Sequence, residues 1–394
     1  MKKIVILGST GSIGVAALDV VSRLGPGYEV IGLAANSNYE LLAEQARSFR
    51  PQYVTLFDEA ASENALGLLP RGSKLLPPGL ESLMTIASLE EADIVVHAMS
   101  GGVGFAPLVA AIKAGKTIAL ANKEPIVMAG AALMKECERW EARIIPVDSE
   151  PSAIFQCLGD RRDSLESLSR VLLTASGGPF FRRRGSLDRV TPKEALRHPR
   201  WKMGRKITVD SATLMNKGFE AMEMQTLFGL PLSKIKIVVH PQSIIHSAVE
   251  FCDGSVLAQM SLPDMRLPIQ YAITYPSRQP SRVEKLDLFS LRKLEFFEPD
   301  FRRFPCLSLA LESARLGGTF PAVLSAADEV AVEAFLAGEI RFTDIARVVE
   351  AVLRRNSSSP LPPSLAEAVE ADSWARVKTA DVIAGGHYRK KTAK

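Results

Sequence analysis

The first part of the chain alternates short, mainly apolar runs with segments of helical periodicity. The apolar runs lie at residues 4–7, 29–35, 53–56, 93–98, 116–121 and 143–145. Between them, apolar side chains recur at the spacing of one helix face in residues 15–24, 39–49 and 106–114. Short apolar runs are typical of strands buried on both faces, and their alternation with helices is typical of a parallel sheet. We therefore predict a doubly wound α/β domain over residues 1–150.

The pattern changes after residue 150. Helical spacing at 153–158 is followed by a polar turn at 160–163, and a new apolar run lies at 171–175. Alternating positions then predict antiparallel strands at 236–240, 247–251 and 255–260, with a hairpin turn at Asp253-Gly254. Helical periodicity returns at 307–316, 321–337, 342–354 and 363–371. We predict a central α+β catalytic domain at 151–280, a proline-bearing linker at 281–306 and a C-terminal helical bundle domain at 307–394.

Composition and charge narrow the class of protein. The chain is 47% apolar and 23% charged, which is typical of a soluble globular protein, and its 394 residues suffice for two or three domains. The net charge of +4 is small and dispersed, so it suits an anionic small molecule as well as a nucleic acid. The charge by itself therefore selects neither kind of partner.

Cysteine usage and the N-terminus indicate the compartment. The four cysteines form no C-x-x-C pair, which argues against a zinc knuckle or a disulfide framework and for a reducing environment. The apolar run at the N-terminus is too brief for a signal peptide, and no run of about 18 apolar residues predicts a transmembrane helix. We expect a cytoplasmic protein with no membrane partner.

A glycine-rich turn follows the first predicted strand. Gly8-Ser9-Thr10-Gly11-Ser12-Ile13-Gly14 lies between that strand and the helical run from Val15 to Leu24. In this position glycines allow the backbone to approach a pyrophosphate, and the helix N-terminus supplies N–H donors. The spacing is G-x-x-G-x-x-G and differs from the commoner G-x-G-x-x-G, so a plain tight turn is the alternative to a dinucleotide site.

The end of the second predicted strand indicates which dinucleotide is bound. Acidic residues at this point favour NAD, because they bind the ribose 2′-hydroxyl. Residues 35–38 contain no Asp or Glu, which favours NADP, but they also contain no Lys or Arg to pair with a 2′-phosphate.

Two carboxylates, Asp148 and Glu150, follow the last strand of the first domain. In an extended chain they would project to the same side and would suit a hard divalent cation such as Mg²⁺ or Mn²⁺. The alternative is a helix N-terminus, in which Asp148 or Ser149 is the cap and Glu150 favours the helix dipole. A metal site needs a third ligand, and Glu220 is the candidate, with Glu223 as a competing choice one turn further on.

Other polar groups predict a phosphate-binding site, and one loop is a candidate lid over the substrate. Asn216 and Lys217 share a helix face with Glu220 and, with Ser211, offer the donors that hold a phosphate. The Ser176-Gly177-Gly178 turn after a strand is a candidate anion nest, and Lys123 follows another strand. The 198–204 segment has neither helix nor strand periodicity, and its Trp201 predicts either a mobile cover over a substrate or a loop packed on the core.

Three further features are predicted to be structural. His240 and His246 have a spacing that fits no usual metal pair, so we expect both to be satisfied structural histidines. The Ala326–Val330 segment is predicted to serve surface and packing roles.

Taken together, these motifs resemble those of the 1-deoxy-D-xylulose 5-phosphate reductoisomerase family, in order and over nearly the whole chain. The matching stretches are Gly8–Gly14, Ala121–Glu124, Val147–Glu150, Ala175–Phe180, His198–Gly204, Ser211–Glu220 and His240–Ser247. The resemblance implies an NADPH-dependent enzyme that rearranges a phosphorylated ketose and reduces the resulting aldehyde to 2-C-methyl-D-erythritol 4-phosphate, within the non-mevalonate route to isoprenoid precursors. It also implies a small-molecule substrate, no nucleic-acid partner and a homodimer.

The resemblance also assigns roles by position. The metal, which would be Mg²⁺, Mn²⁺ or Co²⁺, is assigned to Asp148, Glu150 and Glu220. The substrate is assigned to Lys123, Ser149, Glu150, Ser176, His198, Trp201, Met203, Ser211, Asn216, Lys217 and Glu220. Within this set Ser176, Ser211, Asn216 and Lys217 hold the phosphate, and Trp201 and Met203 lie on the lid. The cofactor is assigned to Thr10, Gly11, Ser12, Ile13, Asn36, Ser37, Asn38, Asn122, Glu124 and Gly204. The catalytic group comprises Lys123, Asp148, Glu150, Glu220 and His198.

One position departs from the family pattern. Many members carry Gly followed by Lys or Arg where this chain has Asn36-Ser37. Hydroxyl and amide donors can hold a 2′-phosphate with a weaker charge contribution, so we expect a less strict preference for NADPH over NADH. Two other classes of protein share the cofactor fold: a metal-free oxidoreductase, such as a homoserine or sugar dehydrogenase, and a non-catalytic NADP-binding sensor.

Overall fold

The computed structural model describes residues 1–159, 165–201, 203–357 and 361–385, and the predicted polar turn at 160–163 lies outside them. The chain divides into two compact units, neither of which is continuous in sequence. The first unit comprises Met1–Pro125, Leu133–Ser152 and Asp264–Glu284. The second unit comprises Ile126–Ala132, Ala153–Pro263 and Lys285–Lys394.

A parallel seven-stranded sheet forms the centre of the first unit. Its strands, in spatial order, are β4 (Lys74–Leu75), β3 (Tyr53–Leu56), β2 (Tyr28–Ala35), β1 (Lys2–Leu7), β5 (Ile94–His97), β6 (Thr117–Leu120) and β7 (Arg143–Pro146). The order reverses between β1 and β5, where Leu7 pairs with His97. A reversal of this kind leaves a crevice at the carboxyl ends of the two strands, where ligands bind in such folds. The predicted doubly wound sheet is confirmed.

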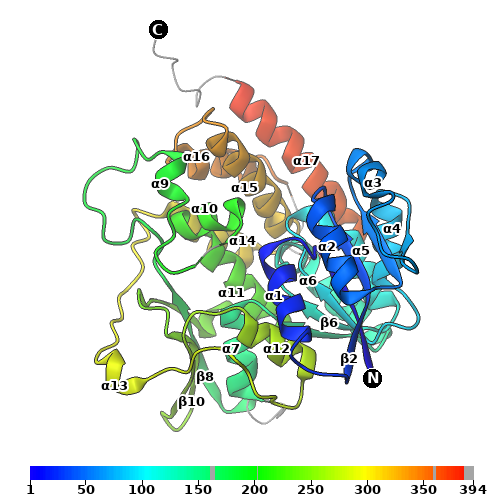
Figure 1. The fold of residues 1–394 in the computed structure, drawn as a ribbon. Helices are drawn as coiled ribbons and strands as arrows, with labels where there is room; N and C mark the ends of the chain where they lie inside the picture. Colours follow the sequence, from blue (N-terminus) through cyan, green and yellow to red (C-terminus); the bar gives the residue numbers. More distant parts are fainter. Residues whose placement is uncertain (160–164, 202, 358–360, 386–394) are drawn as a thin grey trace. The chain divides into compact units, whose positions relative to one another are not determined.

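Helices cover this sheet (Figure 1). They are α1 (Ser12–Val21), α2 (Tyr39–Phe49), α3 (Glu59–Ala65), α4 (Leu80–Ala87), α5 (Phe105–Lys113), α6 (Glu124–Arg139) and α12 (Arg266–Thr274). α2 has the same bounds as the helix predicted at 39–49. Asn38 caps its start, and Arg50 ends it by adopting the left-handed conformation. The residues of β1 from Ile4 to Leu7 are fully buried, which explains why the run is apolar throughout.

Two segments explain why the units are discontinuous. α12 returns to the first unit, where it contacts α1, β6 and β7 through a face that buries Ile269, Ala272 and Ile273. α6 departs from helical geometry at Ala129, and its middle part belongs to the second unit. The functional domains predicted from the sequence are continuous stretches, so these units do not correspond to them residue by residue.

The second unit contains a mixed four-stranded sheet. Its order is β11 (Val256–Met260), β10 (Ile245–Phe251), β8 (Leu168–Ala175) and β9 (Ile235–Val239). β8 and β9 are parallel, while β10 is antiparallel to both β8 and β11. The predicted hairpin turn is confirmed, since Gly254 has a positive φ of 87° and Asp253 accepts the N–H of Ser255.

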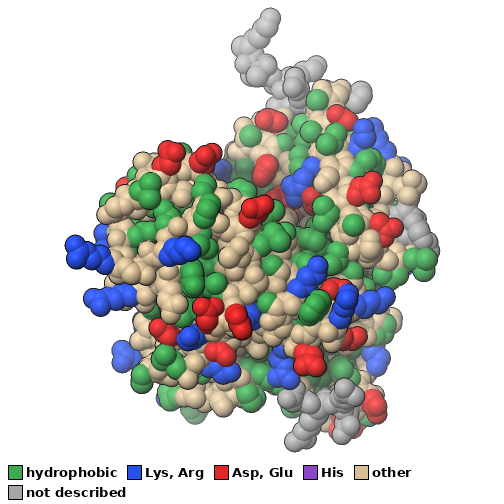
Figure 2. All heavy atoms as spheres, turned by 90° about the vertical axis from the view of Figure 1, so that its right-hand side faces the viewer, with side chains coloured by type: hydrophobic (Ala, Val, Ile, Leu, Met, Phe, Trp, Pro, Cys, Tyr) green, Lys and Arg blue, Asp and Glu red, His purple; other side chains and the backbone are tan. Residues whose placement is uncertain are grey.

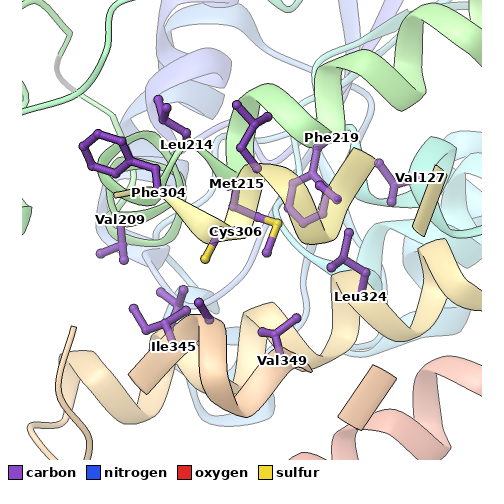
Figure 3. Close-up of a cluster of buried hydrophobic side chains, with 14 of the residues drawn as sticks. Val127, Val209, Leu214, Met215, Phe219, Phe304, Cys306, Leu324, Ile345 and Val349 are labelled. Atoms are coloured by element: carbon purple, nitrogen blue, oxygen red, sulfur yellow. The ribbon is translucent and has the colours of Figure 1, made fainter. Parts of the chain in front are cut away.

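The remaining described helices belong to the second unit, and all of them except the helix at Leu288–Leu291 contribute buried residues to its apolar core. They are α9 (Pro192–Ala195), α10 (Arg205–Thr213), α11 (Met215–Phe228), α13 (Leu288–Leu291), α14 (Pro305–Leu316), α15 (Phe320–Leu336), α16 (Asp344–Leu353) and α17 (Leu365–Ala384), with most of α7 (Ser149–Leu158). Figure 1 shows α15, α16 and α17 packed together in orange to red, and α17 continues well beyond the predicted helix at 363–371. In Figure 3, Met215 and Phe219 of α11 lie among apolar side chains of α14, α15 and α16. The predicted C-terminal helical region is therefore confirmed as helical over its described residues.

One face of the molecule shows how its charged side chains are distributed. On the face shown in Figure 2, basic and acidic side chains are interspersed, in keeping with the small net charge of +4. Within the described part of the chain, no helix combines the length and the apolar character that a membrane span requires.

Close packing of α11 on α14 leads to a stability prediction. A Cβ added at Gly218 would lie 2.1 Å from the Cβ of Ala310, so Gly218→Ala should overpack this contact although alanine favours helices. We expect the free energy of unfolding to fall by about 1–2 kcal/mol, measured by urea denaturation followed by circular dichroism. The double variant Gly218→Ala/Ala310→Gly is the matched control and should recover most of the loss. A single variant as stable as the parent would contradict the contact.

Candidate active site

The glycine turn of the first unit depends on close backbone approaches. Gly8 has a φ of +82°, and a Cβ there would lie 2.5 Å from the carbonyl oxygen of Ala98, just after β5. A Cβ at Gly14 in α1 would lie 2.3 Å from the carbonyl oxygen of Gly8. Gly11 is the N-cap of α1 and makes no side-chain cap hydrogen bond, and the first N–H groups of a helix, here from Ser12 and Ile13, have no partner within the helix. The turn and helix start fit the pyrophosphate of a dinucleotide.

The end of β2 has no basic residue. Asn36, Ser37 and Asn38 are exposed, and the Asn38 side chain accepts the Leu41 N–H at 3.1 Å as the cap of α2. The carbonyl of Asn36 accepts the N–H of Asp58, so an acidic residue lies beside this segment. The groups able to bind a 2′-phosphate here are neutral.

The loops that follow β5 and β6 are joined by a hydrogen bond. Asn122 donates from Nδ2 to the Gly101 carbonyl at 3.1 Å, and its Oδ1 accepts the Glu124 N–H at 3.2 Å. His97 is fully buried, and its Nε2 lies 2.9 Å from the Gly104 carbonyl oxygen. Burial lowers the pKa of His97 to about 4, so the ring is neutral at physiological pH and Nε2 donates to Gly104. The sequence motifs did not identify His97. A histidine at the end of an otherwise apolar strand could have indicated a buried polar group there.

A lysine and a carboxylate meet at the ends of β6 and β7. The ammonium of Lys123, which is 3% exposed, forms an ion pair with Asp148 Oδ2. Asp148 Oδ1 also accepts the N–H of Ser149 at 3.0 Å, and Ser149 Oγ donates to Glu150 Oε2 at 2.5 Å. β7 ends at Pro146 and α7 begins at Ser149, so the extended conformation considered for Asp148 and Glu150 is wrong and the helix start is right. Glu150 lies in the first turn, where the helix dipole favours a negative charge.

Glu220 of the second unit is fully buried and has donors on both oxygens. Asn216 Nδ2 donates to Oε1 at 2.6 Å, and the Lys217 ammonium forms an ion pair with Oε2. The predicted shared helix face of these three residues is therefore confirmed. Glu223 is also buried, but Asn216 and Lys217 both engage Glu220, which favours Glu220 as the ligand.

A second cluster of the same unit lies around Ser176, directly after β8. Gly178 donates its N–H to Ser176 Oγ at 3.2 Å, and a Cβ at Gly178 would lie 2.5 Å from the carbonyl oxygen of Ser211. Only glycine allows this approach of the turn to the end of α10, which carries Ser211. His198 Nε2 lies 3.0 Å from Ser176 Oγ, while its Nδ1 accepts the N–H of Trp201 at 2.9 Å. Because Nδ1 is an acceptor, the neutral ring carries its proton on Nε2 and donates to Ser176.

The loop that follows His198 is packed in part. The Trp201 ring lies 6.1 Å from the His246 ring, centre to centre, and Met203 is half-buried. Gly204 precedes α10, and Lys202 lies outside the described residues.

The two histidines predicted to be structural have hydrogen-bond partners. His246 lies within hydrogen-bond distance of Ser261, at 2.9 Å, and His240 forms hydrogen bonds with the Glu295 carbonyl and the Ile244 N–H. Both histidines are satisfied within the protein, as predicted.

The predicted site residues thus fall into two sets. The first unit carries Thr10, Gly11, Ser12, Ile13, Asn36, Ser37, Asn38, Asn122, Lys123, Glu124, Asp148, Ser149 and Glu150. The second unit carries Ser176, His198, Trp201, Met203, Gly204, Ser211, Asn216, Lys217 and Glu220. The first set fits a dinucleotide and offers hard oxygen ligands, and the second fits an anion and adds a buried carboxylate.

Comparison with known proteins agrees with this chemistry. Residues 4–130 match the model of the 1-deoxy-D-xylulose 5-phosphate reductoisomerase family. Residues 144–228 match the C-terminal domain of the same enzyme, and 260–378 match a "DXP reductoisomerase C-terminal domain". The 1-deoxy-D-xylulose 5-phosphate reductoisomerase of Elusimicrobium minutum is 58% identical over 394 residues, which is 99% of each chain. The enzyme of Pelotomaculum thermopropionicum is 53% identical over 386 residues, which is 97% of this chain and 99% of that one.

Solved structures are similar as well. The reductoisomerase from Zymomonas mobilis in complex with NADPH has a TM-score of 0.89 at 40% identity, covering 97% of this chain and 99% of that chain. A DOX-P reductoisomerase in complex with NADPH, fosmidomycin and magnesium has a TM-score of 0.92 at 38% identity, covering 98% of each. With family models, full-length relatives and solved structures in agreement, the chain belongs to the 1-deoxy-D-xylulose 5-phosphate reductoisomerase family.

Proposed function

We propose that this chain is an NADPH- and divalent-metal-dependent oxidoreductase. It rearranges 1-deoxy-D-xylulose 5-phosphate and reduces the product to 2-C-methyl-D-erythritol 4-phosphate, in the non-mevalonate pathway to isoprenoid precursors. The observation that carries this proposal is the buried Glu220 with its partners Asn216 and Lys217, in the unit that also carries the Ser176 turn. A carboxylate held among phosphate-binding donors suits a substrate that offers both a phosphate and metal-binding oxygens.

NADPH is assigned to the first unit and to the start of α10. Its residues are Thr10, Gly11, Ser12, Ile13, Asn36, Ser37, Asn38, Asn122, Glu124 and Gly204. The N-terminal N–H groups of α1 would bind the pyrophosphate, and Asn122 would orient the ring at the carboxyl end of β6. When bound, the cofactor supplies the hydride for the reduction. Its presence in solved relatives supports the assignment.

The phosphate is assigned to four side chains of the second unit. Ser176 and Ser211 offer hydroxyl groups, Asn216 an amide and Lys217 an ammonium. His198 donates to Ser176 and so fixes the orientation of its hydroxyl. Trp201 and Met203 are assigned to a lid that excludes water. Binding at the phosphate, remote from the reacting carbons, orients the ketose.

Asp148, Glu150 and Glu220 are assigned to the divalent metal. Carboxylate oxygens suit Mg²⁺, Mn²⁺ or Co²⁺, and a solved relative contains magnesium. When bound, the metal polarises the substrate carbonyl and eases loss of a hydroxyl proton. Lys123 holds Asp148 through its ion pair, Ser149 donates to Glu150, and both are assigned to contact the substrate as well.

We further infer a cytoplasmic homodimer whose functional domains are NADPH binding (1–150), catalysis and dimerisation (151–280), a linker (281–306) and a helical domain (307–394). Support for the dimer comes from β11, which is the edge strand of its sheet and leaves Val256 and Leu257 half exposed. An exposed apolar edge strand is prone to pair with another chain, and a second copy would cover it.

Metal removal tests the proposed reaction. Oxidation of NADPH in the presence of 1-deoxy-D-xylulose 5-phosphate, followed by absorbance, should stop with EDTA and return on addition of excess Mg²⁺ or Mn²⁺. NADPH binding, followed by fluorescence, should persist in EDTA and serves as the control. Activity that survives EDTA would instead indicate a metal-free dehydrogenase, and NADPH binding without any oxidation would indicate a sensor.

The carboxylate ligands are tested by substitution. Glu150→Gln keeps the shape of the side chain but removes its charge, so kcat should fall by roughly 100-fold or more, since even outer partners of metal ligands are worth 10- to 100-fold. The dissociation constant for NADPH should stay nearly unchanged. Glu138→Gln, an exposed carboxylate of α6, is the matched control and should keep full activity. Activity of Glu150→Gln at the level of the parent would refute the metal assignment.

The neutral segment at the end of β2 predicts the cofactor preference. The ratio of kcat/KM for NADPH over NADH should be modest, because no cation at residues 36–38 pairs with the 2′-phosphate. Ser37→Arg should raise this ratio about tenfold, since a hydrogen bond to a charged group contributes about 1.5–3 kcal/mol. Ser37→Gln, which adds length without charge, should not. A large NADPH preference in the unaltered enzyme would contradict this inference.

A further inference from the structure

Two buried carboxylates of the second unit share one lysine. Asp210 of α10 and Asp328 of α15 are 1% and 0% exposed. The ammonium of Lys206 lies 2.7 Å from Asp210 Oδ2 and 3.0 Å from Asp328 Oδ2. From the sequence we predicted that Ala326–Val330 serves surface and packing roles. Asp328 is fully buried, so the surface role is wrong for this residue. None of these three residues is used in the site described above.

Charge balance requires a proton at this cluster. Two carboxylates and one ammonium would leave a net negative charge in the interior, which costs several kcal/mol. One proton shared between the carboxylates makes the cluster neutral. In agreement with this, burial and the neighbouring Asp328 carboxylate raise the pKa of Asp210 well above its ordinary value, although Lys206 opposes the shift.

The cluster joins the helices that carry the phosphate-binding residues. Asp210 directly precedes Ser211 on α10, so any displacement of Asp210 also displaces Ser211. The Lys206 ammonium lies 4.6 Å from the centre of the Phe219 ring, and Phe219 lies two residues after Lys217 on α11. Through Asp328, the same ammonium contacts α15. One cation therefore links α10, α11 and α15.

We propose that Asp328 is a positioning residue for phosphate binding: with Lys206 and Asp210 it holds α10 against α15 and α11, and the shared proton makes substrate affinity depend on pH. The inference rests on the proposed function, because it assigns the phosphate to Ser211 and Lys217. Asp328 does not touch the substrate and acts through Lys206 and Asp210.

Few other titratable groups lie on the described helices that contact α10. They are Lys193 and Glu194 on α9, Lys217, Glu220 and Glu223 on α11, Cys306, Glu312 and Arg315 on α14, and Glu329 and Glu333 on α15. Lys217 pairs with Glu220, Glu194 with Arg183, Glu312 with Arg315, and Glu329 with Arg376. Burial raises the pKa of the Cys306 thiol, with smaller contributions from the Asp328 and Asp210 carboxylates, so the thiol stays uncharged. Lys206, Asp210 and Asp328 therefore carry the pH dependence.

The sign of the effect follows from the raised pKa. At low pH the pair holds its proton and the cluster is neutral. As the pH rises through the raised value, the second carboxylate ionises, the two carboxylates repel each other, and α10 loses its fixed position against α15. The stability that the shared proton contributes is present below the ordinary Asp pKa and is lost as the pH rises through the folded value. Affinity for the phosphate should fall in the same direction.

Asp328→Asn tests the proposal because it keeps the shape and leaves a neutral Asp210–Lys206 pair. In the holoenzyme, KM for 1-deoxy-D-xylulose 5-phosphate should rise with increasing pH at least ~5-fold more in the parent than in Asp328→Asn, with kcat changing alike in both. Ionisation of the substrate phosphate affects both proteins equally and cancels. Glu329→Gln, the next residue on α15, is the matched control and should follow the parent.

Two further measurements keep the outcomes distinct. The thermal midpoint of the parent should fall more steeply with rising pH than that of Asp328→Asn, and this comparison needs no substrate. If no protein turns over the ketose phosphate, the proposed function fails while the melting curves still test the shared proton. Parallel pH profiles of KM in parent and Asp328→Asn would overturn the positioning role, and parallel melting profiles would overturn the shared proton.

Discussion

Pairing of buried lysine ammonium groups with carboxylates is the interaction on which the polar architecture of this protein depends. Lys123 holds Asp148 where β6 and β7 end, and Lys217 holds Glu220 within α11. Removing one partner from a buried pair such as Lys217–Glu220 costs about 3–5 kcal/mol, because the remaining charge has no compensation. Each pair therefore fixes its carboxylate in one position, and a carboxylate that is fixed before a ligand arrives loses little freedom when it binds one.

The sequence was sufficient where burial leaves little choice. The part of β1 from Ile4 to Leu7 is enclosed on both faces, so only apolar residues fit there and the run is visible in the sequence. The glycine turn was equally visible, since Gly8 and Gly14 meet backbone atoms too close for any side chain. The helix face of Asn216, Lys217 and Glu220 followed from local spacing alone. Assignment of these groups to a particular reaction came from the family resemblance.

The sequence was insufficient where the outcome depends on distant partners. The choice between strand and helix at Asp148 and Glu150 turned on two or three residues, which propensity does not resolve. Asp328 looks like a surface residue in its own helix, and only the position of Lys206 on α10 explains its burial. The return of α12 to the first unit is a contact between segments far apart in the chain, and no local pattern encodes it.

That return has a consequence for biosynthesis. On the ribosome, the sheet of the first unit emerges early, but the face that α12 covers stays open until α12 itself has left the exit tunnel. By then most of the second unit's sheet has also left the exit tunnel, so the two units mature during the same interval rather than in succession. A nascent chain arrested between Pro146 and Asp264 would expose apolar surface on β6, β7 and α1, and such surface is what chaperones recognise.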